Sequence, residues 1–295
     1  MKINKFTGIN NTAAAKKLPL GTCVEATNVV FNGDGQVSRR PGTTQLASTP
    51  VIASYGTFDQ SQLFFVRDDL SITHFDGSAY TPVGAVGHNN YCFWAEESPQ
   101  MVFCAQYDSI QVWSGGSFGP LDTSDHGLTT GTKPLTIVGD IVRINWIAGK
   151  LCVASYLNGF SRITFSVPGM YGRVSIEEDW FEVPHLVTGL EAFGTNLVIA
   201  CTDAIFLYNV QTGILAKTVE YGTPVGRPIA RYKPDKAFIW TTRGVVEYPT
   251  WENLTKDVYL TNPGEGCGSA IIQFEGNEYL VVSHDNLGLN YEVKA

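Results

Sequence analysis

The sequence predicts an all-β fold, and three features of the chain support this prediction. Glycine and proline are abundant, with 30 and 14 copies in 295 residues, and aromatic residues make up 12%. Charged residues make up only 16%, below the roughly 25% of an average soluble protein. Short apolar runs separated by turn residues recur along the chain, which is typical of many short strands joined by tight turns.

From about residue 50 the chain repeats one unit: an apolar run, a turn, and a second run that ends on an aromatic residue. The first copy is Leu63–Val66, a turn at Asp68-Asp69, and Ser71–Phe75. The six closing aromatic residues, separated by 38, 52, 43, 40 and 43 residues, are Phe75, Trp113, Phe165, Tyr208, Tyr248 and Tyr291. A period near 40 predicts a β-propeller, whose four-stranded blades span roughly 40 to 50 residues, and six copies predict six blades.

Each blade needs a strand before and after this central pair. An extended stretch precedes every copy, for example Ile52–Tyr55, and another follows the first five copies, for example Gly77–Tyr80. The sixth copy has none before Ala295, so residues 28–45 are predicted to complete the last blade and close the propeller. The predicted organisation is an N-terminal arm, residues 1–27, followed by a single propeller domain, residues 28–295.

Segments outside the repeat are predicted to be connectors. Asn11-Thr12 can cap one or two helical turns over Ala13–Lys17, which Pro19 ends. Residues 1–20 fit two interpretations equally well: an arm that docks on a neighbouring protein, or a frayed terminus. Irregular insertions at Asp122–Pro134 and Pro168–Pro184 are predicted sites of partner contact, because the blades do not need them.

Charge and cysteine usage exclude several classes of protein. A net charge of −8 argues against a general nucleic-acid binder, which needs a basic surface. No run approaches the roughly 18 to 20 apolar residues of a membrane helix, and the start has no secretory signal pattern. The cysteines form no C-x-x-C pair, so buried free thiols are expected; they are Cys23, Cys92, Cys104, Cys152, Cys201 and Cys267.

Motifs with catalytic residue types have simpler interpretations. Gly115–Gly119 fits G-x-S-x-G, but it occupies the turn of the repeat where Asp76–Tyr80 stands, and a nucleophile elbow needs a helix after it. Ser283-His284-Asp285 is expected to be a polar turn, since triads assemble from distant positions. The acid pairs Asp68-Asp69, Glu96-Glu97 and Glu177-Glu178-Asp179 are expected to be solvated loops rather than a glycosidase pair. No catalytic, cofactor-binding or metal-binding residue is predicted.

We also interpret Asn32–Gly35 as a turn. The segment contains fragments of a calcium-binding loop but lacks the bidentate glutamate at the end of such a loop. The residues on either side alternate as strands, Asn28–Phe31 and Gln36–Arg39. The segment therefore predicts a β-hairpin.

The first 45 residues resemble the start of tail and virion structural proteins of tailed bacteriophages. The residues that carry the resemblance are Glu25-Ala26-Thr27-Asn28, a turn at Gly33-Asp34-Gly35, and Arg39-Arg40-Pro41-Gly42. In that family a short arm leads into an "EA-x-N" strand, a glycine-aspartate turn and an "RRPG" strand before a propeller. The nozzle proteins of the family are usually much longer than this chain.

The resemblance implies a non-enzymatic structural component of a bacteriophage tail, of the nozzle, hub or tail-stabilising type. Such a protein forms a homo-oligomeric ring around or below the DNA channel, where it can make passive contact with the genomic DNA. It also contacts other tail, adaptor or portal proteins. It belongs to the virion and is assembled in the bacterial cytoplasm without a cofactor or a membrane. The alternative is a propeller that binds or cleaves carbohydrate at a cell surface, which predicts acidic and aromatic residues clustered at one mouth. A cellular interaction scaffold is a third alternative.

Overall fold

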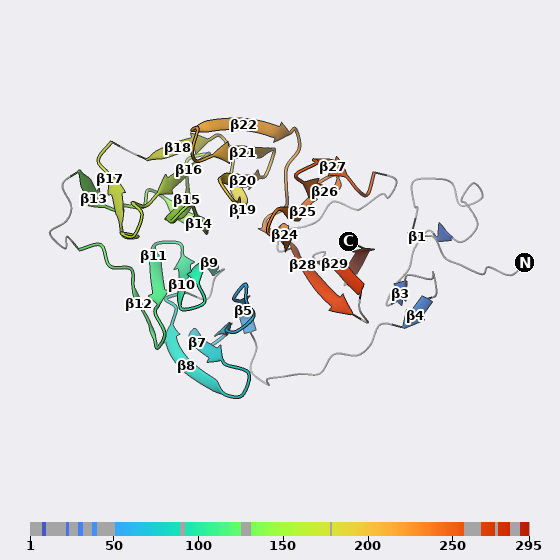
Figure 1. Cartoon of the computed structure of the whole chain (residues 1–295), viewed down its shortest axis with the longest axis horizontal. Helices are drawn as coiled ribbons and strands as arrows, with labels where there is room; N and C mark the ends of the chain where they lie inside the picture. The colour runs from blue at the N-terminus through green and yellow to red at the C-terminus, as the bar shows by residue number, and fades with distance from the viewer. Residues whose placement is uncertain are drawn as a thin grey trace, which may run out of the picture. The chain divides into compact units, whose positions relative to one another are not determined.

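The structure of the chain is a computed structural model. It describes residues 51–88, 92–124, 131–177, 179–256, 267–274, 277–283 and 290–294, together with four short N-terminal strands. These four strands are β1 (Gly8–Ile9), β2 (Thr22–Cys23), β3 (Val29–Phe31) and β4 (Val37–Arg39). Throughout the described residues the secondary structure is β, with no helix, so the predicted all-β class is confirmed (Figure 1).

The described residues contain six four-stranded sheets, numbered here in chain order. The first three are β5 (Val51–Gly56), β6 (Leu63–Arg67), β7 (Ser71–Phe75) and β8 (Tyr80–Ala85); β9 (Phe93–Ser98), β10 (Met101–Gln106), β11 (Ser109–Trp113) and β12 (Phe118–Pro120); and β14 (Asp140–Ile147), β15 (Lys150–Leu157), β16 (Phe160–Phe165) and β18 (Trp180–Val183). In each, neighbouring strands are antiparallel and follow chain order, as in a propeller blade.

The next sheets continue the pattern with one variation. The fourth and fifth are β19 (Val187–Phe193), β20 (Asn196–Cys201), β21 (Ile205–Asn209) and β22 (Ile214–Val219); and β24 (Ile229–Lys233), β25 (Lys236–Thr241), β26 (Gly244–Tyr248) and β27 (Glu252–Asn253). The sixth holds β28 (Cys267–Phe274), β29 (Asn277–Ser283) and β30 (Asn290–Lys294), and its fourth strand is β23 (Gly226–Arg227), which runs parallel to β28. No strand follows β30 in this sheet within the described residues.

The sheets pack face to face because alternate residues of the central strands point to opposite sides. Val102 and Cys104 of β10 lie in a core with the first sheet, whereas Phe103 and Ala105 of the same strand lie in a core with the third. The second sheet is therefore buried on both faces. Another core joins the fifth and sixth sheets, through residues such as Trp240. The fold is thus propeller-like, with layered sheets that cover one another.

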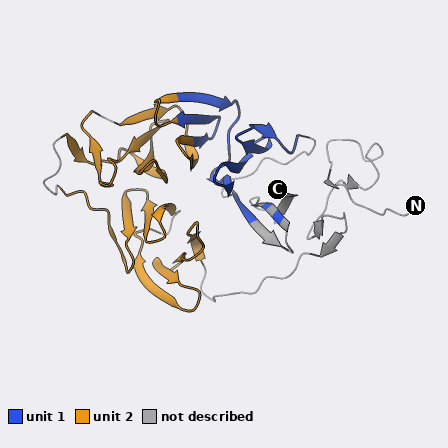
Figure 2. Cartoon of the chain, viewed as in Figure 1, with its two compact units in different colours: residues 1–44, 198–208, 215–295 blue, residues 45–197, 209–214 orange. Residues whose placement is uncertain are grey.

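The chain divides into two compact units, coloured separately in Figure 2. Unit 1 comprises residues 1–44, 198–208 and 215–295, and unit 2 comprises residues 45–197 and 209–214. Unit 2 holds the first three sheets with their two shared cores, and unit 1 holds the fifth and sixth.

Several sequence predictions can be compared with this fold. The predicted hairpin at the N-terminus is confirmed, since β3 and β4 pair antiparallel with Val29 opposite Arg39. A strand follows each of the first five closing aromatic residues, as predicted: β8, β12, β18, β22 and β27. The stretch Gly77–Tyr80 is wrong as a strand, since β8 begins only at Tyr80. The predicted helix over Ala13–Lys17 lies outside the described residues, and so does His284-Asp285.

Pro168–Pro184 holds an insertion, as predicted, but the prediction that it is irregular is wrong. It contains β17 (Arg173–Ser175) and also β18, the outer strand of the third sheet. The repeat was obscured because the extra strand β17 separates the third and fourth strands of this sheet.

Candidate interaction surface

Two insertions of unit 2 meet and order each other. β13 (Thr132–Pro134) lies in the first insertion and β17 in the second, and they form an antiparallel ladder with Lys133 opposite Val174. Two further backbone bonds extend it, from Leu135 N to Gly172 O at 2.8 Å and from Ile176 N to Gly131 O at 2.9 Å. We call β13 and β17 the inserted ladder. It is a structured addition to the repeat and a candidate contact surface.

Arg173 holds the inserted ladder together from inside. Its side chain is only 6% exposed. Its Nε donates to Thr132 Oγ1 at 2.9 Å, its Nη2 to Thr132 O at 3.1 Å, and its Nη1 to Thr123 O at 3.2 Å. The planar guanidinium thus joins three segments through neutral acceptors, as its fork of donors allows.

Gly172 is required by the same close packing. A Cβ built on Gly172 would lie 2.0 Å from the carbonyl oxygen of Asp122 and 3.0 Å from Thr123 Cα. Only glycine lets the second insertion pass so close to the backbone of the first.

An acidic and aromatic cluster lies beside this surface. The hydroxyl of Tyr171 donates to the Glu97 carboxylate, with both oxygens at 2.9 Å. The Tyr171 ring meets Trp146 edge-on with centroids 5.0 Å apart, and Trp146 in turn stacks on Phe103. Desolvation, reinforced by the hydrogen bond to Glu97, raises the pKa of Tyr171 to about 12.

Glu96 joins the first two sheets of unit 2. Its side chain is 7% exposed, and its Oε2 accepts from Tyr55 Oη at 2.9 Å and from Phe58 N at 3.0 Å. Burial raises the pKa of this carboxyl above its usual value, partly offset by these two donors, while Asp59 adds to the rise. The ring of Tyr55 also stacks on Trp94, with centroids 5.4 Å apart.

The prediction that Glu96-Glu97 is a solvated loop is therefore wrong. Both residues lie in β9, which continues to Ser98 and contains a bulge opposite Met101-Val102. A bulge places two residues opposite one and so breaks the alternation on which the strand boundary was predicted. The interpretation of Asp68-Asp69 is confirmed, since both lie in the turn between β6 and β7.

The remaining motifs lie where turns were predicted, as far as the structure describes them. Gly115–Gly119 joins β11 to β12, so two strands flank it rather than a strand and a helix. Asp179, the last residue of the third acid group, forms an ion pair with Lys150. Across the described residues no group of three or more histidine, cysteine or acidic side chains is placed to hold a metal ion.

Four cysteines are buried and form no disulfide, as predicted: Cys92, Cys104, Cys152 and Cys201. Burial raises the pKa of the Cys201 thiol to about 12 and also raises the pKa of the Cys152 thiol. Such thiols are protonated and act as small apolar side chains. The side chains of Cys23 and Cys267 lie outside the described residues.

Comparison with known proteins supports the fold and does not supply a family. No family model and no curated protein matches the chain. Three solved structures resemble it. One is the extracellular domain of a protein described as a one component system from B. thetaiotaomicron, with a TM-score of 0.51 and 12% identity over 84% of this chain and 34% of that chain. Another is BBS1N in complex with ARL6DN, with a TM-score of 0.51 and 12% identity over 81% of this chain and 76% of that chain. The third is U3-55K, with a TM-score of 0.50 and 11% identity over 81% of this chain and 76% of that chain.

The chain thus spans about a third of the length of the bacterial extracellular domain that it matches. At such low identity the three likenesses bear on fold alone. Among the described residues there is no helix that is long and apolar enough to cross a membrane.

Proposed function

We propose that this chain is a non-enzymatic structural component of a bacteriophage tail, of the nozzle or hub type, and that it assembles as a homo-oligomeric ring. The observation that carries the proposal is the N-terminal hairpin. The two strands that the phage-like motif predicts pair with each other, Val29 opposite Arg39 and Phe31 opposite Val37. The part of the phage-like segment that the structure describes thus forms one β-hairpin, which supports the proposal.

The architecture of unit 2 suits such a role. The first three sheets share two cores and form a rigid block, and the inserted ladder supplies a structured contact surface outside the repeat. In this proposal the six four-stranded sheets are the six blades of one propeller, and residues 28–45 complete the sixth. Neighbouring tail, adaptor or portal proteins would be the partners of the ladder.

Mass measurement of the purified full-length protein by light scattering, followed by negative-stain imaging, tests the proposal. We expect rings of several subunits, or a monomer that forms rings when mixed with tail or portal proteins. A stable monomer that ignores those proteins contradicts it.

A second candidate, a carbohydrate-binding propeller, is favoured by one observation. Glu97, Tyr171 and Trp146 form the kind of acidic and aromatic cluster that this alternative predicts. However, the rings of Trp146 and Tyr171 pack on each other and on Phe103, whereas a sugar platform needs an open ring face. Binding of bacterial polysaccharide by the wild-type protein, lost in Trp146→Ala and Tyr171→Ala, would favour this candidate.

A further inference from the structure

One hairpin of unit 2 differs from its counterparts in the first two sheets. There the residues that flank the turn between the second and third strands are polar, Arg67 and Ser71 in the first sheet and Gln106 and Ser109 in the second. Between β15 and β16 the turn is Asn158-Gly159, and its flanking pair is Leu157 and Phe160. Both turn residues have positive φ, 52° and 92°, as a tight two-residue hairpin requires.

The flanking side chains of this hairpin are exposed. Phe160 is 51% exposed and Leu157 is 46% exposed. Val138, 37% exposed, lies in the segment that runs against the hairpin, because a Cβ built on its neighbour Gly139 would lie 2.8 Å from Leu157 Cβ. We call Val138, Leu157 and Phe160 the apolar tip. A cluster of large apolar side chains in water is a common mark of a contact surface.

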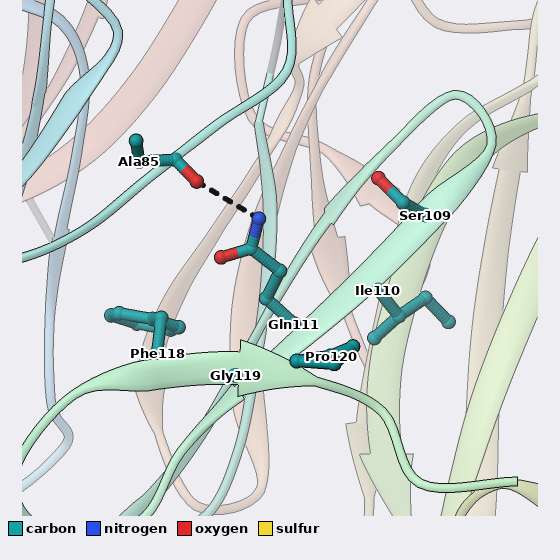
Figure 3. Close-up of a pocket in the computed structure, with 7 residues that line it drawn as sticks. All are labelled: Ala85, Ser109, Ile110, Gln111, Phe118, Gly119 and Pro120. Atoms are coloured by element: carbon teal, nitrogen blue, oxygen red, sulfur yellow. Dashed lines mark hydrogen bonds between the residues drawn. The ribbon is translucent and has the colours of Figure 1, made fainter.

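Unit 2 also carries a hollow with matching chemistry (Figure 3). Its volume is about 280 Å³, and it lies between the outer strand of the first sheet and the outer half of the second. The lining residues, none of them charged, are Ala85, Ser109, Ile110, Gln111, Phe118, Gly119 and Pro120. Gln111 spans the two sheets and donates from Nε2 to Ala85 O at 2.9 Å.

We propose that the apolar tip of one copy of this chain inserts into the hollow of a neighbouring copy. Both surfaces are uncharged, so their contact leaves no buried charge without a partner. A cavity of about 150 Å³ accommodates benzene, so the hollow has room for the Phe160 ring. No residue of the tip lines the hollow of its own copy, so the tip can enter only the hollow of a second copy.

The contact would use two different surfaces of each copy. Such a head-to-tail contact repeats from copy to copy and gives a ring when the rotation closes. The inference therefore rests on the proposed ring and names the contact that builds it. Three side chains are far fewer than the roughly 20 to 30 residues per side of a stable interface, so the tip is an anchor within a larger contact.

Cross-linking tests the direction of the contact. In a background in which Cys23 and Cys267 are replaced by serine, Phe160→Cys and Ser109→Cys add one thiol on the tip and one on the rim of the hollow, at exposed positions. We expect a disulfide-linked dimer when the two variants are mixed and oxidised, and little when either is oxidised alone. A cross-link formed by one variant alone as readily as by the mixture, or by neither, overturns the inference.

Paired substitutions test the contribution to assembly. A side chain at Gly119 points into open space, since a Cβ there meets no atom within 4 Å, and Gly116 in the neighbouring turn is equally open. Gly119→Leu should fill the hollow and raise the concentration needed for assembly by about tenfold or more, whereas Gly116→Leu should not. Phe160→Ser should act like Gly119→Leu. Phe58→Ser, which changes a phenylalanine that is 63% exposed elsewhere on unit 2, is its control.

These outcomes separate this inference from the proposed function. If the wild-type protein forms rings and Gly119→Leu and Phe160→Ser assemble as well as their controls, the tip contact is wrong and the ring remains. If the wild-type protein stays a monomer alone and with tail proteins, both are wrong.

Discussion

At the level of single residues, the inserted ladder depends on positions where a small change has a large effect. Arg173 and Gly172 are adjacent, and both serve the contact with the segment around Asp122. Sequence alone could not predict this pairing, because no local pattern links residues that lie about 50 positions apart. The glycine in Tyr171-Gly172-Arg173 reads as an ordinary turn residue until its neighbour is known.

Gly172→Ala tests this close approach. The added methyl group would overlap the Asp122 carbonyl, so we expect a loss of about 2 kcal/mol or more in the free energy of unfolding. Gly116→Ala, at an open position, is the control and should change stability by less than about 0.5 kcal/mol. Urea denaturation of the two variants measures the difference, and equal midpoints would contradict the structure.

Glu96 makes stability depend on pH in a defined direction. Its pKa is raised in the folded protein, so the fold favours the protonated form relative to the unfolded chain. The stability that this group contributes is complete below the unfolded pKa near 4.5 and is lost as pH rises through the folded value. Relative to Glu96→Gln, the wild-type protein should therefore lose stability as pH rises from about 4 to about 7.

Urea denaturation of wild type and Glu96→Gln at several pH values measures this loss. Glu177→Gln, which changes an exposed carboxylate, is the control. A difference between wild type and Glu96→Gln that does not change with pH, or that changes in the opposite direction, would show that the carboxyl is not desolvated as described.

At the level of elements, turns of the repeat are stabilised by side chains that accept backbone hydrogen bonds. Asp76, between β7 and β8, accepts from Ser78 N and Ala79 N, each at 2.9 Å, and from Ser78 Oγ at 2.8 Å. These donors lower its pKa to about 2. The turn was predictable from Asp-Gly-Ser because aspartate favours this local bonding.

Asp76 therefore offers a direct test of an element. In a carboxyl-carbon NMR titration we expect its midpoint at about 2, below the ordinary 3.8. The stability that the turn gains from Asp76 is present above the unfolded value and is lost as pH falls through the folded value. Ser78→Ala removes one donor and should raise the midpoint, whereas Ser117→Ala in the corresponding turn after β11 should leave it unchanged. A midpoint near 3.8 in the wild type would contradict the turn geometry.

Some of the strands could be predicted from the sequence and others could not. Apolar runs such as Leu197–Ala200 predicted the central strands, because both faces of these strands are buried and their sequence is continuously apolar. Prediction failed at Glu96, where a bulge interrupts the periodic pattern, and at β17, an ordered strand in a segment expected to be irregular. The candidate surface was harder still, because the exposure of Leu157 and Phe160 depends on how neighbouring sheets cover them.

At the level of the whole molecule, the sixth sheet determines how the repeat ends. The other five sheets place a strand beyond their third consecutive strand, but nothing in the described residues pairs with β30 on that side. An uncovered strand edge presents unpaired backbone donors and acceptors, and proteins normally cover such edges. The N-terminal hairpin is a two-stranded sheet, marginally stable by itself, that would gain from joining a larger one.

We therefore expect two N-terminal deletions to behave differently. Removal of residues 1–27 takes away the arm and should leave the melting temperature unchanged. Removal of residues 1–45 also takes away β3 and β4 and should lower it by about 5 °C or more, because a strand of the sixth sheet is lost. Equal melting temperatures for the two deletions would show that the hairpin does not complete this sheet. The dependence on concentration then distinguishes two arrangements: a melting temperature that is constant on dilution indicates closure within one chain, and one that falls on dilution indicates that the hairpin is exchanged between copies.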